Sequence, residues 1–204
     1  MGGELNWLRK IVVFMVEIIG DKITLKFAEE KDSKTIYDMM VCDEVGQFMF
    51  NEDYPAPTWE QFIEEESSYF PGKASRQGSY LIIYHEGRRA GAINYVCGYE
   101  KAPYAELNIW LAGYEFMGKK IGCSAVELVK EFIHKAYKVE HFIIRPWTRN
   151  LTAIQAYNRC GFYENASFNL NDYYSDETMK TSAGGGYGPR ETVNLYCNYV
   201  KENV

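Results

Sequence analysis

The strongest constraint on the fold comes from residues 106–162, where strand and helix patterns alternate. An apolar strand ELNIWLA leads into a turn GYEFMGKKIG, and an amphipathic helix CSAVELVKEFIHKAY follows. A second strand, VEHFIIRPWT, and a second helix, NLTAIQAYNRCGF, complete the stretch. The start of a helix exposes unpaired backbone N–H groups and the positive end of the helix dipole. The turn with Gly118 and Gly122 therefore suits an anionic ligand such as a diphosphate.

The second helix of this stretch carries its own start signal. Asn150 stands where an N-cap is expected, because its side-chain oxygen can accept from a free N–H of the first turn. Ile154 and Tyr157 lie three residues apart and share one helical face.

These two segments together resemble the GNAT superfamily of N-acetyltransferases, and most nearly its aminoglycoside 6'-N-acetyltransferase-like branch. The family's turn reads Gln/Arg-x-x-Gly-x-Gly/Ala, and its second motif reads Asn-x-x-Ala-Ile-x-x-Tyr-x-x-x-Gly-Phe. The turn positions are held here by Met117, Gly118, Lys119, Lys120, Ile121 and Gly122, and the second motif is matched in full by Asn150, Ala153, Ile154, Tyr157, Gly161 and Phe162. The turn departs from the pattern at Met117 and at Lys120, which replaces a glycine. The resemblance implies acetyl transfer from acetyl-CoA to an amine.

The resemblance also implies roles for individual residues. Backbone N–H groups of Trp110 or Leu111 would hold the thioester oxygen, and Tyr157 would donate a proton to the departing thiolate. Lys119 and Lys120 would attract the phosphates of CoA. The residues expected to bind acetyl-CoA are Trp110, Leu111, Met117, Gly118, Lys119, Lys120, Ile121, Gly122, Cys123, Asn150, Ala153 and Tyr157.

The strand ELNIWLA is where the family places a general base. Related enzymes have an aspartate at the position of Asn108, and an asparagine cannot accept a proton usefully. Glu106 lies two residues earlier on the same face of the strand, so it becomes the better candidate, acting directly or through water. The alternative is that Glu106 pairs with a lysine or arginine of the next strand.

The remaining elements complete the predicted architecture. Alternating or apolar runs predict strands at 21–29, 79–84, 90–97, 139–144, 163–170 and 192–200, and apolar stripes predict helices after Asp32 or Ser33, after Thr58 and over 119–137. Antiparallel strands followed by strand–helix–strand units favour an α/β (α+β) domain with a mixed, mostly antiparallel sheet of six to seven strands and helices on both faces. We expect one domain over 15–204, with residues 1–14 as an N-terminal extension.

Composition narrows the class of ligand. The net charge is -6 and no lysine or arginine stripe is visible, which argues against a nucleic-acid partner. No apolar run is long enough to span a bilayer. An acidic balance suits cationic small molecules.

The cysteines and histidines show no metal-ligand spacing, so a metal site is not expected. The five cysteines form an odd set and are interpreted as free thiols in a reducing, cytoplasmic compartment.

Every charged side chain between Lys34 and Lys73 is acidic. This stretch is either a solvated helical face or a funnel for a polycationic amine, and in the GNAT family the corresponding helices and loop wall the acceptor site. The expected acceptor residues are Glu52, Asp53, Tyr54, Trp59 and Tyr187. The segment 171–191, which contains Tyr187, either folds over the substrate or is disordered.

The predicted function is therefore an acetyl-CoA-dependent N-acetyltransferase acting on a small cationic amine, of the aminoglycoside or polyamine type. Two alternatives stay open: acetylation of a protein N-terminus or ribosomal protein, and a non-catalytic acyl-CoA-binding module. The sequence leaves a homodimer open as well.

Overall fold

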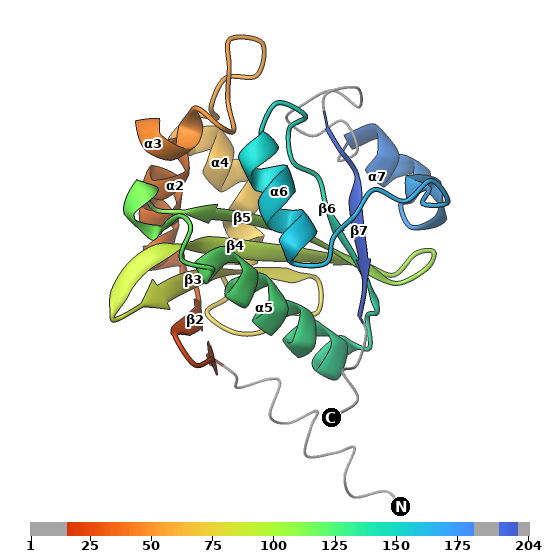
Figure 1. Ribbon diagram of the computed structural model, residues 1–204, viewed down its shortest axis with the longest axis horizontal. Helices are drawn as coiled ribbons and strands as arrows, with labels where there is room; N and C mark the ends of the chain where they lie inside the picture. The colour runs from red at the N-terminus through yellow and green to blue at the C-terminus, as the bar shows by residue number, and fades with distance from the viewer. Residues whose placement is uncertain (1–15, 182–191, 200–204) are drawn as a thin grey trace, which may run out of the picture.

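The computed structural model describes residues 16–181 and 192–199, so the predicted extension 1–14 and Tyr187 lie outside the described residues. Its centre is a seven-stranded sheet in which the strands follow their sequence order (Figure 1). The strands are β1 (Glu17–Ile19), β2 (Ile23–Phe27), β3 (Gly78–His85), β4 (Arg88–Gly98), β5 (Tyr104–Leu111), β6 (His141–Ile144) and β7 (Leu195–Asn198). All neighbours are antiparallel except β5 and β6, which are parallel. The prediction of a mixed, mostly antiparallel sheet is confirmed.

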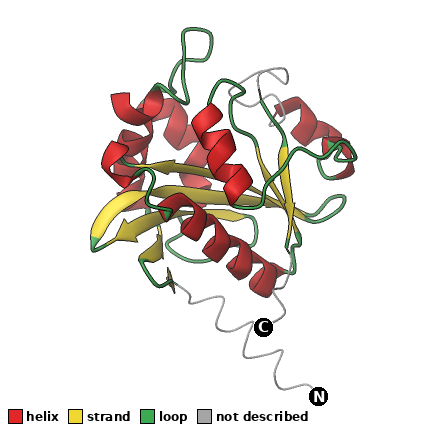
Figure 2. Ribbon diagram, viewed as in Figure 1, coloured by secondary structure: helices red, strands yellow, loops and turns green. Residues whose placement is uncertain are grey.

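Helices cover both faces of this sheet (Figures 1 and 2). One face packs against α5 (Ile121–Tyr137) and α6 (Leu151–Arg159), and the other against α2 (Ser33–Val41), α3 (Asp43–Gly46) and α4 (Trp59–Glu66). A last helix, α7 (Asp176–Thr181), and four short 3-10 turns complete the described part: η1 (Glu30–Asp32), η2 (Ser67–Tyr69), η3 (Tyr114–Phe116) and η4 (Leu170–Asp172). Within the described residues, no helix is both long and apolar enough to cross a bilayer.

Local sequence signals account for most of these elements. Ile23, Leu25 and Phe27 alternate along β2 and are all buried, as the period of two requires. Thr58 caps α4 in a reciprocal capping box with Gln61, which satisfies two backbone N–H groups at the helix start.

The predicted strand 163–170 is wrong. Only Tyr163 pairs with β7, as an isolated bridge to Tyr196. The chain then turns, because the Asn165 side chain accepts from Ser167 N at 2.9 Å and its carbonyl accepts from Phe168 N at 2.9 Å. Asparagine side chains bond their own local backbone in this way and thereby compete with a strand ladder. Conversely, the short edge strand β1 was not predicted.

Candidate active site

The candidate active site lies where the two central strands, β5 and β6, separate. Strand β5 pairs with β6 only over Tyr104–Glu106, and the two strands then diverge (Figure 1). Ala112 N donates to Ala90 O at 2.8 Å, and successive residues of an antiparallel strand point their N–H groups to alternate sides. The N–H groups of Ile109 and Leu111 therefore point toward the opening, whereas that of Trp110 points toward β4. Of the two predicted oxyanion donors, the geometry favours Leu111.

The turn before α5 leaves its backbone donors free. Met117 N donates to Tyr114 O at 3.0 Å. None of the N–H groups from Gly118 to Cys123 donates a hydrogen bond to another described residue. Gly118 and Lys120 both have left-handed backbone conformations, with φ of 74° and 64°. Lys120 thus adopts the conformation that a glycine would adopt more easily, at a cost of about 1–2 kcal/mol. These free N–H groups lie at the start of α5, which is the positive end of the dipole of this 17-residue helix.

The start of α6 lies where the motif predicts. Asn150 Oδ1 accepts from Ala153 N at 3.0 Å, which confirms the N-cap, and its Nδ2 donates to Phe48 O at 3.3 Å. Tyr157 is half-buried and borders the same core as Leu111 and Cys123. Of the predicted cofactor residues, Leu111, Cys123 and Tyr157 therefore border one core beside the opening, whereas Trp110 belongs to the cluster on the other face of the sheet.

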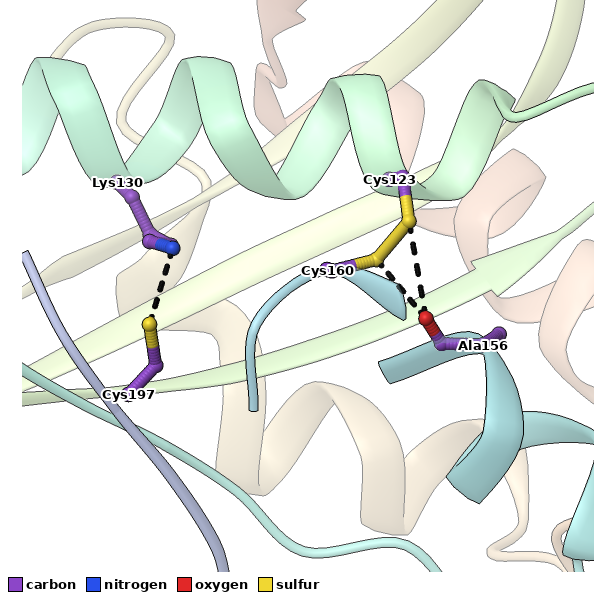
Figure 3. The surroundings of a disulfide bond; sticks show 5 residues. All are labelled: Cys123, Lys130, Ala156, Cys160 and Cys197. Atoms are coloured by element: carbon purple, nitrogen blue, oxygen red, sulfur yellow. Dashed lines mark hydrogen bonds between the residues drawn. A yellow bond between two sulfur atoms is a disulfide. The ribbon is translucent and has the colours of Figure 1, made fainter. Parts of the chain in front are cut away.

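A disulfide joins Cys123 in the first turn of α5 to Cys160 just after α6 (Figure 3). The prediction that all five cysteines are free thiols is therefore wrong for these two, which are 37 residues apart in sequence but have Cα atoms 5.4 Å apart. The other three, Cys42, Cys97 and Cys197, are free thiols. Because two of the five cysteines form a disulfide, the cysteines no longer support the prediction of a reducing compartment.

Glu106 is held on both carboxylate oxygens. Arg145, which directly follows β6, donates from Nε to Glu106 Oε1 at 2.8 Å, and Tyr174 donates its hydroxyl to Oε2. The side chains of Arg145 and Glu106 are 8% and 14% exposed, so the pair is well shielded from solvent. Burial and the adjacent Glu106 raise the pKa of Tyr174 well above its usual range. Of the two roles predicted for Glu106, this geometry favours pairing with a cation over acting as a base.

A cavity of about 780 Å³ opens beside this cluster, on the face of the sheet that packs against α4. Among its described lining residues there are four carboxylates, and Arg145 is the one basic side chain. Since Arg145 already pairs with Glu106, the described part of the lining carries a net negative charge. Its polar and charged lining residues include Glu65, Glu66, Glu100, Glu106, Asn94 and Asn108.

Of the predicted acceptor residues that the structure describes, none lines this cavity. Glu52, Asp53 and Tyr54 lie on the loop between α3 and α4 that extends from the body in Figure 1, where Asn51 Oδ1 accepts from the N–H groups of Asp53 and Tyr54. Trp59 packs on Tyr37 with ring centroids 5.4 Å apart and belongs to the hydrophobic cluster under α4. The acidic stretch does reach the cavity, but through Glu65 and Glu66 at the end of α4.

Sequence reasoning missed Arg145 and Asn94, and it did not predict the contact of Tyr174 with Glu106. The position of Arg145 directly after a buried strand was one available signal, and the tyrosines of the segment after 170 were another. Nothing in the sequence marked Asn94, which stands in the middle of an apolar run.

Comparison with known proteins identifies the family. The acetyltransferase (GNAT) domain model matches residues 22–163, while no curated protein matches the sequence significantly. Similar solved structures are the aminoglycoside acetyltransferase AAC(6')-Ib in complex with paromomycin and acetyl-CoA (19% identity, TM-score 0.62, covering 87% of this chain and 94% of that one) and the microcin C7 self-immunity acetyltransferase MccE with acetyl-CoA and AMP (15%, 0.64, 94% and 99%). Another is spermidine N-acetyltransferase from Vibrio cholerae with CoA and spermine (14%, 0.62, 88% and 96%). The domain match spans more than half of the sequence, and the chain therefore belongs to the GNAT family of acetyl-CoA-dependent acetyltransferases.

Proposed function

We propose that this enzyme transfers the acetyl group of acetyl-CoA to a primary amine of a small polycationic acceptor, of the aminoglycoside or polyamine type. The observation that carries the proposal is the acidic cavity beside the opening between β5 and β6. Arg145, the one arginine among its described lining residues, is already neutralised by Glu106, so an acceptor with more than one positive charge gains the most there. Solved GNAT structures with paromomycin and with spermine bound are consistent with this class.

The co-substrate would lie on the other side of the opening. The free N–H groups from Gly118 to Cys123 would bind the pyrophosphate of acetyl-CoA, aided by the charges of Lys119 and Lys120. Met117, Ile121 and Gly122 would shape this turn. Asn150 and Ala153 at the start of α6 would contact the pantetheine arm.

The reaction follows from these positions. The neutral amine nitrogen attacks the thioester carbonyl carbon, while the Leu111 N–H stabilises the developing oxyanion. The C–S bond then breaks, the Tyr157 hydroxyl protonates the departing thiolate, and the proton released by the acylated nitrogen returns to the Tyr157 oxygen through water. An alkylammonium of pKa about 10.4 must first lose a proton. Because Glu106 already accepts two hydrogen bonds and Asn108 is not a base, we assign that proton to water oriented by Asn108.

An assay of product formation, with CoA binding measured beside it, tests this function. Purified protein is incubated with acetyl-CoA and a panel of aminoglycosides, polyamines and peptides with free N-termini, and products are identified by their mass. Acetylation of the polycations but not of the peptides is expected. Acetylation of peptides alone would favour a protein acetyltransferase, and binding of CoA without any product would favour a non-catalytic module.

The role of Tyr157 is tested by Tyr157→Phe. We expect kcat to fall on the order of 100-fold, with little change in the KM for acetyl-CoA, because the hydroxyl acts on the leaving group. Tyr163→Phe is the matched control, since Tyr163 lies outside α6 and is 59% exposed. Equal losses in kcat and in acetyl-CoA affinity would mean that Tyr157 only packs.

A further inference from the structure

A row of polar side chains crosses the sheet beneath the acidic cavity. Tyr80 on β3 pairs with Asn94 on β4, and Asn94 pairs with Asn108 on β5. Directly paired residues share a face, so the three side chains lie side by side. The row ends at Asn108, where β5 has already lost its pairing with β6.

Asn94 is the unusual member of this row. It is 4% exposed and lines the cavity, yet among the described residues no donor reaches its Oδ1. Nearly all buried polar groups in folded proteins have a hydrogen-bond partner. The oxygen and nitrogen of an asparagine amide exchange places when the group rotates by half a turn, so either end can face the cavity. An amide without a partner at a cavity wall points to a partner that a ligand supplies.

Glu66 stands at the far end of the row. Tyr80 donates its hydroxyl to Glu66 Oε2 at 3.0 Å, and Glu66 forms no salt bridge with a described residue. Glu65 adjoins it, and the arginine of the cavity is bound to Glu106. Burial raises the pKa of Glu66, which reflects the cost of keeping an unpaired carboxylate there. A cation from outside would relieve that cost.

The spacing of the strands separates this end of the row from the reacting end. Tyr80 lies two strands away from β5, which corresponds to roughly 10 Å at about 4.8 Å per strand. Tyr80 holds Glu66 at this end of the row, away from the opening between β5 and β6. The distance is suitable for a second cationic group on the same acceptor.

We propose that Glu66, with Asn94 beside it in the row, forms a subsite for a second ammonium group of the acceptor, one to two strand spacings (roughly 5–10 Å) from the amine that is acetylated. This proposal rests on the proposed function for the identity of the reacting end. The subsite makes the enzyme selective for diamines over monoamines of the same length. Glu66 is the specificity-determining charge, and Asn94 is the hydrogen-bond acceptor.

Binding tests the subsite independently of turnover. The full chain is titrated with α,ω-diaminoalkanes from cadaverine to diaminooctane, and with the monoamine of each length, in an NMR titration with and without CoA. Wild-type protein should bind the best diamine at least about tenfold more tightly than its monoamine, since a charged hydrogen bond replaces an unpaired carboxylate. In Glu66→Gln this ratio should fall to about one, while monoamine affinity stays within about twofold of wild type.

Two further variants sharpen the result. Glu64→Gln is the matched control, because Glu64 is exposed on the same helix and does not line the cavity, and it should keep the wild-type ratio. Asn94→Leu should lose diamine affinity without losing thermal stability, because the amide it removes has no partner in the protein. Equal binding of diamine and monoamine to wild type, or an unchanged ratio in Glu66→Gln, overturns the proposal. If diamines bind selectively but no amine is acetylated, the proposed function fails while the subsite stands.

Discussion

Replacing Arg145 with methionine should lower the free energy of unfolding by about 3 kcal/mol. The substitution removes the cation from Glu106, whose side chain is 14% exposed in the wild-type protein, while keeping most of the volume of the arginine side chain. Removing one partner of a buried pair costs about 3–5 kcal/mol, because the remaining charge is desolvated and unpaired. The hydroxyl of Tyr174 still donates to the other carboxylate oxygen, so we expect the lower end of that range.

Urea unfolding followed by circular dichroism measures this loss as a shift in midpoint at constant slope. The surface pair of Arg88 and Glu115 is the matched control, since its atoms are 2.9 Å apart but its side chains are 66% and 50% exposed. Arg88→Met should cost less than about 1 kcal/mol, because solvent screens that pair.

A double variant completes the cycle. Combining Glu106→Leu with Arg145→Met removes both charges, so its stability should lie above that of Arg145→Met despite carrying the additional substitution. Additive losses, or a cost of Arg145→Met no larger than that of Arg88→Met, would show that solvent already screens Glu106. The assignment of Glu106 to structure rather than to base catalysis would then lose its support.

Three further changes test other parts of the fold. Cys160→Ala should lower the free energy of unfolding under oxidising conditions by about 2–4 kcal/mol relative to wild type. It should also make stability insensitive to a reducing agent. If a reducing agent left the unfolding midpoint of the wild-type protein unchanged, the cross-link would be refuted. Lys138→Gly should raise stability by about 0.5–1 kcal/mol, because Lys138 ends α5 with φ of 61°, whereas Lys135→Gly inside the same helix should lower it. Burial raises the folded-state pKa of Glu66 above 4.5, so the folded protein binds that proton more tightly, and the stabilisation is lost as pH rises through the folded pKa. Glu66→Gln should therefore gain stability over wild type between pH 4.5 and neutrality, measured as a difference in melting temperature, and a constant difference across that range would contradict the shift.

Local patterns were sufficient for most elements of the fold. The alternation along β2, the cap at Thr58 and the cap at Asn150 each depend on residues within four positions of one another, which a sequence displays directly. The prediction failed at 163–170 for an equally local reason, because Asn165 forms a turn where apolar residues suggested a strand. The motif around Tyr157 identified the family, and the family model that matches 22–163 confirms it.

The candidate site depended more on distant contacts. The sequence alone determined that a helix with free N–H donors follows an apolar strand, and that Asn150 caps α6, because both are properties of short segments. Only the tertiary structure decided that Arg145 and Tyr174 hold Glu106, that Cys123 bonds Cys160, and that Glu66 rather than Glu52 reaches the cavity. Those partners come from segments far apart in the chain, and which ones meet depends on where the sheet brings its strands together and where it lets them separate.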